Sequence, residues 1–225
     1  MAGDALAAVE GALRHDFSDR HLLVEALTHA SYAAEHDGVA HYQRLEFLGD
    51  AIVELVTTDM IFAAMPDEPE GQMTKVRAAV VDEPTLATVG RAWGLDVAMR
   101  MGVGEERSGG RSRDSILSDV VESVIAAVYL DAGFPTADRL IRAVWGPIID
   151  ERIARTDVAD ARSRLQEQLA THGQTVSFTH ERSGPDHAAV FTARAIVGGT
   201  VIGSGTGGSK KAAAIAAARD ALERQ

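Results

Sequence analysis

Two pairs of acidic residues stand within two otherwise apolar stretches of this 225-residue chain. Glu46 and Asp50 are four residues apart, and Asp119 and Glu122 are three apart. Residues at these spacings are neighbours on a helix, so each pair shares one helical face. Almost no Lys or Arg lies within either stretch, and buried carboxylates normally pair with a cation or bind a metal. Four carboxylates that converge predict a site for a hard divalent cation.

The elements that must position these acids are helices. Apolar residues with helical spacing cover roughly residues 5–14, 20–35, 42–65, 73–81, 83–93, 114–132 and 137–155. Pro66, Pro69 and Gly71 end the first acidic helix, and the Gly-, Arg- and Ser-rich segment 102–113 is expected to be a loop. Pro147 is expected to kink or split the last of these helices. Gly49, in the middle of the first acidic helix, predicts a close approach of another backbone.

The spacing of apolar residues changes after a short polar linker near residue 155. Residues 162–171 and 209–224 have helical patterns, whereas 175–181, 188–197 and 200–203 alternate or are β-branched, as strands are. The predicted fold class is an all-α domain followed by a small α+β domain of order α-β-β-β-α. The predicted boundaries are 1–154 for the first domain, 155–159 for the linker and 160–225 for the second domain.

The charge of the chain is unevenly divided between these domains. The net charge is −11, but eight Lys and Arg against six Asp and Glu from Asp160 onward leave +2 there and −13 in the rest. Cysteine is absent, which excludes disulfides, thiolate metal sites and a cysteine nucleophile. There is no apolar run of membrane-spanning length and no secretion signal, so we expect a cytoplasmic protein without a membrane partner.

Four segments of the first domain resemble the ribonuclease III family. Residues 43–50 (QRLEFLGD) resemble its signature helix, and residues 26–32 (ALTHASY) resemble the helix before it. Residues 105–111 (EERSGGR) and 115–122 (SILSDVVE) resemble its second acidic segment. The matches follow the order and separations of the family and cover most of residues 5–150. Together they are far more specific than any one of them.

The resemblance implies an all-helical, homodimeric endonuclease that hydrolyses double-stranded RNA with Mg²⁺, for which Mn²⁺ can substitute. It implies 5′-phosphate and 3′-hydroxyl ends, substrates among ribosomal RNA precursors and other structured transcripts, and no organic cofactor. Matched residue by residue, the catalytic and metal-binding carboxylates are Glu46, Asp50, Asp119 and Glu122. Glu70 and Gln43 match an outer site, where Gln43 replaces the usual Glu, and Phe47 and Leu48 match the dimer contact.

General chemistry is consistent with this assignment. Metal ions held by carboxylates can activate a water and stabilise the leaving oxygen of a phosphodiester, and a shared cation explains why four acids tolerate one another. Arg107 and Arg111, in the Gly-rich segment before the second acidic helix, are candidates for contact with RNA phosphates. His29 is either an acid–base group or a structural histidine beside an apolar helix.

The second domain resembles a double-stranded-RNA-binding domain. The resemblance is carried by residues 164–169 (RLQEQL) and 203–213 (GSGTGGSKKAA). Such domains read the shape of a duplex across two minor grooves and the phosphates between them. The matched RNA-binding residues are Gln166, Glu167, His187, Ser209, Lys210 and Lys211. Alanines occupy positions 188, 189 and 214, where the family often has further cations, so we expect this domain alone to bind RNA weakly, with a shallow salt dependence.

Two other functions remain open from the sequence. A non-cleaving duplex-RNA-binding protein could retain the nuclease fold, although loss of one of the four acids would favour that and all four are present. The acids could also form a structural metal site in a helical bundle. Carboxylate di-iron bundles pair Glu with a His three residues later, and neither acidic stretch has such a His.

Overall fold

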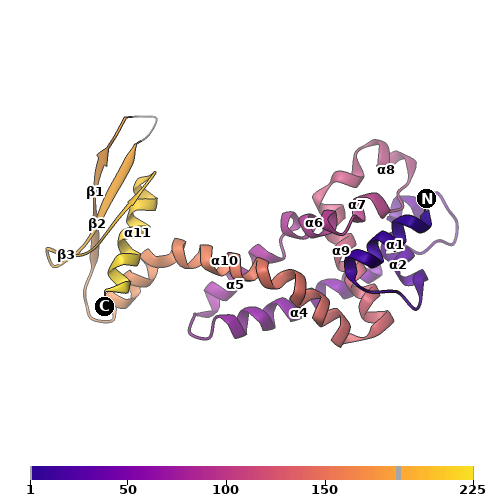
Figure 1. The fold of residues 1–225 in the computed structure, drawn as a ribbon, viewed down its shortest axis with the longest axis horizontal. Coiled ribbons are helices and arrows are strands. Elements are labelled where there is room, and N and C mark those ends of the chain that lie inside the picture. Colours follow the sequence, from indigo (N-terminus) through magenta and orange to yellow (C-terminus); the bar gives the residue numbers. More distant parts are fainter. Residues whose placement is uncertain (1, 186–188, 225) are drawn as a thin grey trace. The chain divides into compact units, whose positions relative to one another are not determined.

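The structure is a computed structural model that describes residues 2–185 and 189–224, with the backbone alone for residues 2, 3 and 156–160. Contacts within the chain divide it into two compact units, with the boundary between residues 152 and 153 (Figure 1). None of the helices in the described part of the chain has the length and apolar character needed to cross a membrane. Each unit is considered by itself below.

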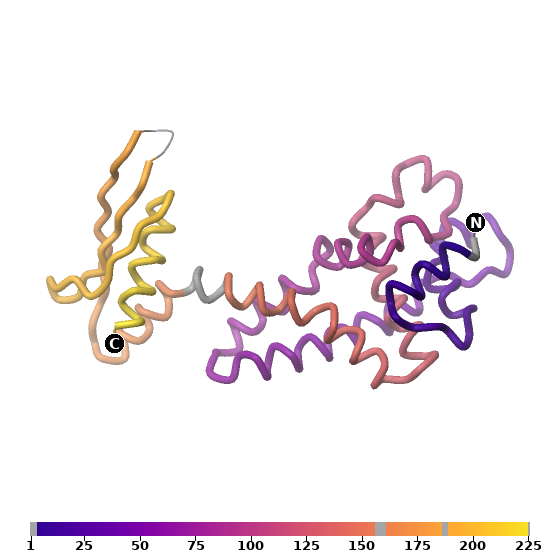
Figure 2. The backbone as a smooth tube through the Cα atoms, viewed as in Figure 1, coloured from indigo at the N-terminus to yellow at the C-terminus, as the bar shows by residue number. Residues whose placement is uncertain are grey.

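The first unit is built from helices, as the sequence predicts. Figure 2 follows its backbone from the indigo N-terminal helix to the first half of α10. The elements and their bounds are α1 (Ala2–Leu13), α2 (Arg20–Ala26), α3 (Ala30–Ala34), α4 (Gln43–Ala64), α5 (Glu70–Val80), α6 (Glu83–Ala92), α7 (Leu95–Ala98), α8 (Val103–Arg107), the 3-10 turn η1 (Gly110–Ser112), α9 (Asp114–Ala132) and α10 (Phe134–Ala170).

Helix α9 is the centre of this unit. It packs against α2, α4, α6 and α7, and every residue from Ile116 to Val128 is buried except the two acids, Asp119 and Glu122. Helix α4 buries only one face, made by residues such as Leu45, Ile52 and Val56. Its apolar character all round predicted a buried helix, but part of its outer face is apolar and exposed.

The crossing of α4 and α9 depends on Gly49. A Cβ atom at this position would lie 1.9 Å from the backbone oxygen of Glu122. No side chain larger than hydrogen fits there without moving one of the two helices. The predicted close approach at Gly49 is therefore confirmed, and it sets the two acidic pairs beside one another.

Two segments of the first unit differ from the sequence prediction. The helix expected over residues 20–35 is broken between α2 and α3, because Thr28 forms a parallel bridge with Arg100 and His29 has an extended backbone. The side chain of His29 accepts the Ser31 N–H and so caps α3. The expected loop at 102–113 contains α8 and η1, two short helical turns that hydrogen bonds hold together.

The segment expected to be a linker is also different. Helix α10 runs from Phe134 to Ala170 and includes Pro147 and the backbone of residues 155–159. The helices expected on either side of this segment therefore belong to one element. Residues 155–161 contain no Gly or Pro, and Ala and Arg favour helix, so nothing in the local sequence ends it. The domain boundaries at 154 and 160 stay a prediction.

The second unit is the predicted α+β arrangement. Strands β1 (Val176–Ser183), β2 (Val190–Val197) and β3 (Thr200–Gly207) form an antiparallel sheet in the order β1-β2-β3. Helix α11 (Lys210–Glu223) packs along this sheet, and the C-terminal part of α10 completes the core with Leu165 and Leu169 (Figure 1).

Strand β3 is longer than predicted because glycines continue it. A Cβ atom at Gly203 or Gly205 would lie 2.4 Å from backbone atoms of Ala217 on α11, and one at Gly207 would lie 2.8 Å from Ala213 N. Alternate residues of a strand face the same side, so these three glycines form one flat surface. The helix can lie close to the strand only because that surface lacks side chains.

Candidate active site and RNA-binding surface

The four predicted acids come together where α4 and α9 cross. Glu46 and Asp50 lie one turn apart on α4 on either side of the Gly49 crossing, and Asp119 and Glu122 lie one turn apart on α9. Glu46, Asp119 and Glu122 are half-buried, and Asp50 is exposed. The acids therefore lie at the rim of the helical core. The apolar sequence around them predicted a position inside the core, and that prediction was wrong.

The charges of these acids act on one another. Burial, and then the charges of Asp50, Asp119 and Glu46, raise the pKa of Glu122 to about 8. Burial, and then Asp119 and Asp50, raise the pKa of Glu46. Burial also raises the pKa of Asp119, although a hydrogen bond from Tyr42 opposes that change. The ionised carboxylates repel one another, and a bound cation would offset this repulsion.

The donor set fits a hard divalent cation. All four groups are carboxylates, and within residues 2–185 and 189–224 none of them forms an ion pair with Lys or Arg. Among the described residues, no three acidic or histidine side chains are close enough together to hold an ion between them. The fit therefore rests on the chemistry of the donors and on their mutual electrostatic effect.

Residues that the sequence analysis did not single out also surround the acids. The Tyr42 hydroxyl donates to Asp119 Oδ2 at 3.1 Å. The charge of Glu54 contributes to the raised pKa of Glu122, and that of Glu83 to the raised pKa of Asp119. Glu54 follows Asp50 by four residues, so helical spacing could have identified it. Tyr42 precedes Glu46 by four residues, but its contact with Asp119 had no such signal, and neither did Glu83, because only the packing of separate helices brings these groups near Asp119.

His29 lies next to this group with its ring nitrogen already engaged. Nδ1 accepts from the Ser31 N–H at 3.1 Å and contacts the Ser31 hydroxyl at 2.7 Å. Burial lowers the pKa of His29, although the nearby charges of Glu105 and Asp119 oppose the change. The imidazole is thus neutral near pH 7 and caps α3, a geometry that favours its structural interpretation over an acid–base role.

The outer-site and dimer-contact candidates lie elsewhere on α4 and α5. Gln43 is the exposed first residue of α4. Glu70 begins α5, accepts from the Thr74 hydroxyl and lines a small cavity beside Phe62. Its charge is not among those that shift the pKa values of Glu46, Asp119 and Glu122. Phe47 is 83% exposed, and Leu48 is half-buried.

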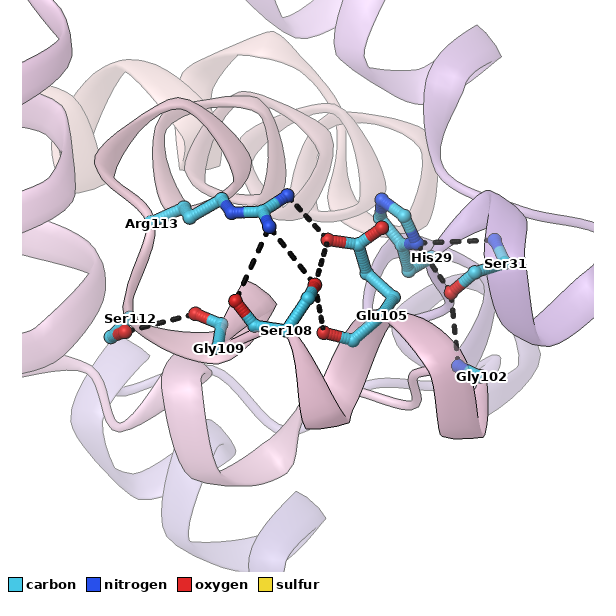
Figure 3. Close-up of polar contacts among 8 residues, drawn as sticks. All are labelled: His29, Ser31, Gly102, Glu105, Ser108, Gly109, Ser112 and Arg113. Atoms are coloured by element: carbon cyan, nitrogen blue, oxygen red, sulfur yellow. Dashed lines mark hydrogen bonds and ion pairs between the residues drawn. The ribbon is translucent and has the colours of Figure 1, made fainter.

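The arginines before α9 have different surroundings. Arg113 pairs with Glu105 at 2.6 Å and also donates to Ser108 (Figure 3). Arg111 pairs with Glu106 and donates to the backbone oxygens of residues 96, 97 and 99. Its guanidinium therefore caps the C-terminal end of α7. Arg107 has no ion pair within the described part of the chain, which leaves it available to an external anion.

The candidate RNA-binding residues of the second unit lie on its surface. Gln166 and Glu167 are exposed on the C-terminal part of α10, and Lys210 and Lys211 are exposed on the first turn of α11. The Ser209 side chain accepts the Ala212 N–H and caps α11. His187 and Ala188 lie outside the described residues. Ala214 is buried in the core. A cation at this position would not reach the surface, so Ala214 does not weaken the RNA-binding surface.

Two family models match this chain. A ribonuclease-III-like model matches residues 19–147, and the double-stranded RNA binding motif matches residues 161–225. The first covers the helices that bring the four acids together. The second covers the end of α10, the three strands and α11.

Known proteins resemble the chain over most of its length. It is 46% identical to "Ribonuclease 3" of Streptomyces coelicolor over 95% of this chain and 77% of that protein. It is 45% identical to "Ribonuclease 3" of Desulforamulus reducens over 90% of this chain and 84% of that protein. Among solved structures, the nuclease domain of ribonuclease III from Campylobacter jejuni aligns with a TM-score of 0.57 and 38% identity, covering 62% of this chain and 97% of that one. The chain therefore belongs to the ribonuclease III family.

Proposed function

We propose that this double-stranded-RNA endonuclease cleaves each strand with Glu46, Asp50, Asp119 and Glu122 as the carboxylates that hold Mg²⁺, or Mn²⁺ in its place. Water attacks the phosphorus and the bond to the 3′ oxygen breaks. The products then carry 5′-phosphate and 3′-hydroxyl ends. The single observation that carries the proposal is the Gly49 crossing, which brings the two acidic pairs together with no cationic partner in the described residues.

The chain's own residues have a defined part in this reaction. Bound Mg²⁺ would supply an activated water and charge stabilisation for the leaving oxygen. The carboxylates supply the oxygen atoms that would bind the cation. They extend from packed helices, and this rigid support keeps their positions fixed. The raised pKa of Glu122 means that binding of a cation at neutral pH must compete with a proton.

We propose that two copies of the chain act together as a homodimer. The outer face of α4 has three large apolar side chains that are exposed in the single chain, Phe47, Leu55 and Phe62. They follow one another at seven or eight residues, so they form a stripe along one side of the helix. A contiguous exposed apolar stripe is typical of a protein interface. In a symmetric dimer this stripe would place one set of acids near each strand of a duplex.

Binding of the RNA duplex is divided between the two units in this proposal. Lys210 and Lys211 at the start of α11 would contact phosphates, and Gln166 and Glu167 would reach a minor groove. In the first unit, Arg107 is the better candidate for phosphate contact, since Arg111 has intramolecular partners. Ribosomal RNA precursors and other structured transcripts are the proposed substrates. Because such transcripts are processed where they are made, we expect a cytoplasmic location.

The proposal is tested by replacing Glu122 with Gln and measuring cleavage of a long RNA duplex with Mg²⁺ and with EDTA. Loss of one preorganised charged group lowers kcat by at least about a hundredfold, while duplex binding in EDTA stays unchanged. Analysis of the fragment ends tests the proposed products. Cleavage by E122Q near the wild-type rate would show that the acids are wrongly assigned.

Glu54→Gln is a matched control for this experiment. It removes the charge of an exposed acid on the same face, one turn beyond Asp50. We expect cleavage close to wild type at saturating Mg²⁺. If E54Q were as damaging as E122Q, the proposed set of four acids would be incomplete. Uncut duplex with the wild-type chain and Mg²⁺ would favour a protein that binds duplex RNA without cleaving it.

A further inference from the structure

Tyr42 connects the two acidic helices from a buried position. Its side chain is only 4% exposed, and its hydroxyl donates to Asp119 Oδ2 on α9 at 3.1 Å. Its backbone oxygen accepts the N–H of Glu46, one turn along α4, at 2.9 Å. One residue at the start of α4 thus contacts an acid of each pair.

The ring of Tyr42 is held by its surroundings. Its backbone N–H donates to the oxygen of Thr28 at 3.0 Å, and its ring lies 5.6 Å from that of His29. His29 is fixed in turn through Ser31, whose hydroxyl accepts the Gly102 N–H (Figure 3). Because the backbone and the ring are both constrained, the hydroxyl has little freedom to leave Asp119.

Asp119 depends on this hydroxyl more than an ordinary surface acid would. Within the described residues, the Tyr42 bond is the one hydrogen bond that Asp119 receives, and no Lys or Arg pairs with it. The bond occupies Oδ2, and no hydrogen bond within the described residues reaches Oδ1. A carboxylate without this donor can rotate freely, and the charges of nearby acids favour rotation away from them.

We infer that Tyr42 is a positioning residue, whose hydroxyl holds the Asp119 carboxylate in the orientation that a divalent cation needs. The inference rests on the proposed function, which makes Asp119 one of the metal-holding acids. Tyr42 touches neither RNA nor metal in this role; it acts through Asp119. The chemistry matches that of other outer partners of metal ligands, which fix the orientation of the group that binds.

The variant Tyr42→Phe tests this role, because it keeps the ring and removes only the oxygen. The first measurement is calorimetric binding of Mn²⁺ to the full chain without RNA. Removal of an outer partner weakens metal affinity about tenfold. The second measurement is cleavage against Mg²⁺ concentration: half-maximal cleavage should need about tenfold more Mg²⁺, and excess Mg²⁺ should restore the rate. Unchanged Mn²⁺ affinity in Y42F would overturn the inference.

Tyr32→Phe is the matched control. The Tyr32 hydroxyl accepts from Arg100 and contacts no acid of the site, so its loss should leave Mn²⁺ affinity unchanged. If Y32F weakened Mn²⁺ binding as much as Y42F, the effect would be structural and the inference would fail.

A double-mutant cycle with Asp119→Ala separates the inference from the proposed function. If Tyr42 acts through Asp119, adding Y42F to D119A changes Mn²⁺ affinity no further. A full additional loss in the double variant would overturn the positioning role while leaving Asp119 as a ligand. If D119A alone had wild-type metal affinity and cleavage, the proposed function of Asp119 would be the part that fails.

Discussion

The two units both rely on glycines where elements approach closely, but they use the closeness differently. In the first unit Gly49 lets α4 cross α9 at the backbone of Glu122, and this crossing brings four acids together. In the second unit Gly203, Gly205 and Gly207 let β3 lie against α11. Across that contact the Ser204 N–H donates to Asp220 Oδ2 at 2.8 Å, and Lys210 and Lys211 stay on the surface.

The difference corresponds to a different proposed role for each unit. The first unit gathers like charges at a half-buried rim, where their pKa values rise and a cation is favoured. Among the described residues, the core of the second unit consists of alanines with Leu165 and Leu169, and its charged residues lie on the surfaces of helices and strands. Metal-dependent hydrolysis needs several carboxylates close together. Recognition of duplex shape instead needs a rigid domain with hydrogen-bond donors and cations on its surface.

The largest effect is expected from Gly49→Ala. The added methyl group would lie 1.9 Å from the Glu122 backbone oxygen, and forced overpacking of this kind costs about 3 kcal/mol of unfolding free energy. We expect loss of cleavage and a lowered melting temperature of the first unit, measured by calorimetry. Gly11→Ala is the control: nothing lies within 4 Å of its Cβ position, so it should stabilise α1 slightly. Equal melting of G49A and wild type would contradict the close crossing.

Gly205→Ala is the corresponding change in the second unit. Its methyl group would lie 2.4 Å from Ala217 N, and the expected loss is about 2 kcal/mol. Duplex-RNA affinity in EDTA should fall, while Mn²⁺ binding by the first unit stays at the wild-type value. Gly208→Ala, where the space is open, should change neither. If G205A weakened Mn²⁺ binding, metal binding would not be a property of the first unit alone.

The next effect concerns pH in the absence of metal. The pKa of Glu122 is raised from 4.5 to about 8 in the folded chain, so the folded state holds a proton that the unfolded state has lost. This stabilisation is fully present below about pH 4.5 and disappears as pH rises through about 8. Urea unfolding in EDTA should therefore show stability falling from pH 5 to 8, and Mg²⁺ should reduce that fall.

Glu122→Gln is the matched variant for the pH measurement. Its side chain has a similar size but no ionisable group, so its stability in EDTA should fall less steeply over the same range. An identical pH dependence in E122Q and wild type would assign the effect to other groups.

The smallest effect is expected from Lys210→Ala and Lys211→Ala. Each change should reduce the slope of log affinity against log salt by about 1, as loss of one phosphate contact does. The wild-type slope should itself be shallow, because the second unit has few cations. Arg219→Ala, on the same helix but paired with Glu223, serves as control and should leave the slope unchanged. Equal slopes for all variants would place the phosphate contacts elsewhere.

Much of the candidate site could be predicted from the sequence because the acids contrast with their apolar neighbours. Helical spacing paired Glu46 with Asp50 and Asp119 with Glu122, and Gly49 indicated the crossing. The same reasoning overestimated their burial, since a pattern of apolar residues does not distinguish a core from an interface between chains. Tyr42 was not identified, because its partner is 77 residues away in the chain.

The sequence by itself determined the helical first unit, the order of strands and helices in the second, and the two acidic pairs, because local periodicity and residue type carry that information. Only the tertiary structure decided which groups share one electrostatic environment. It placed the Tyr42 hydroxyl on Asp119, assigned Arg111 to the end of α7 and left Arg107 unpaired in the described part of the chain. Such contacts join residues that are distant in the chain, and they depend on how closely backbones approach, which no local pattern records.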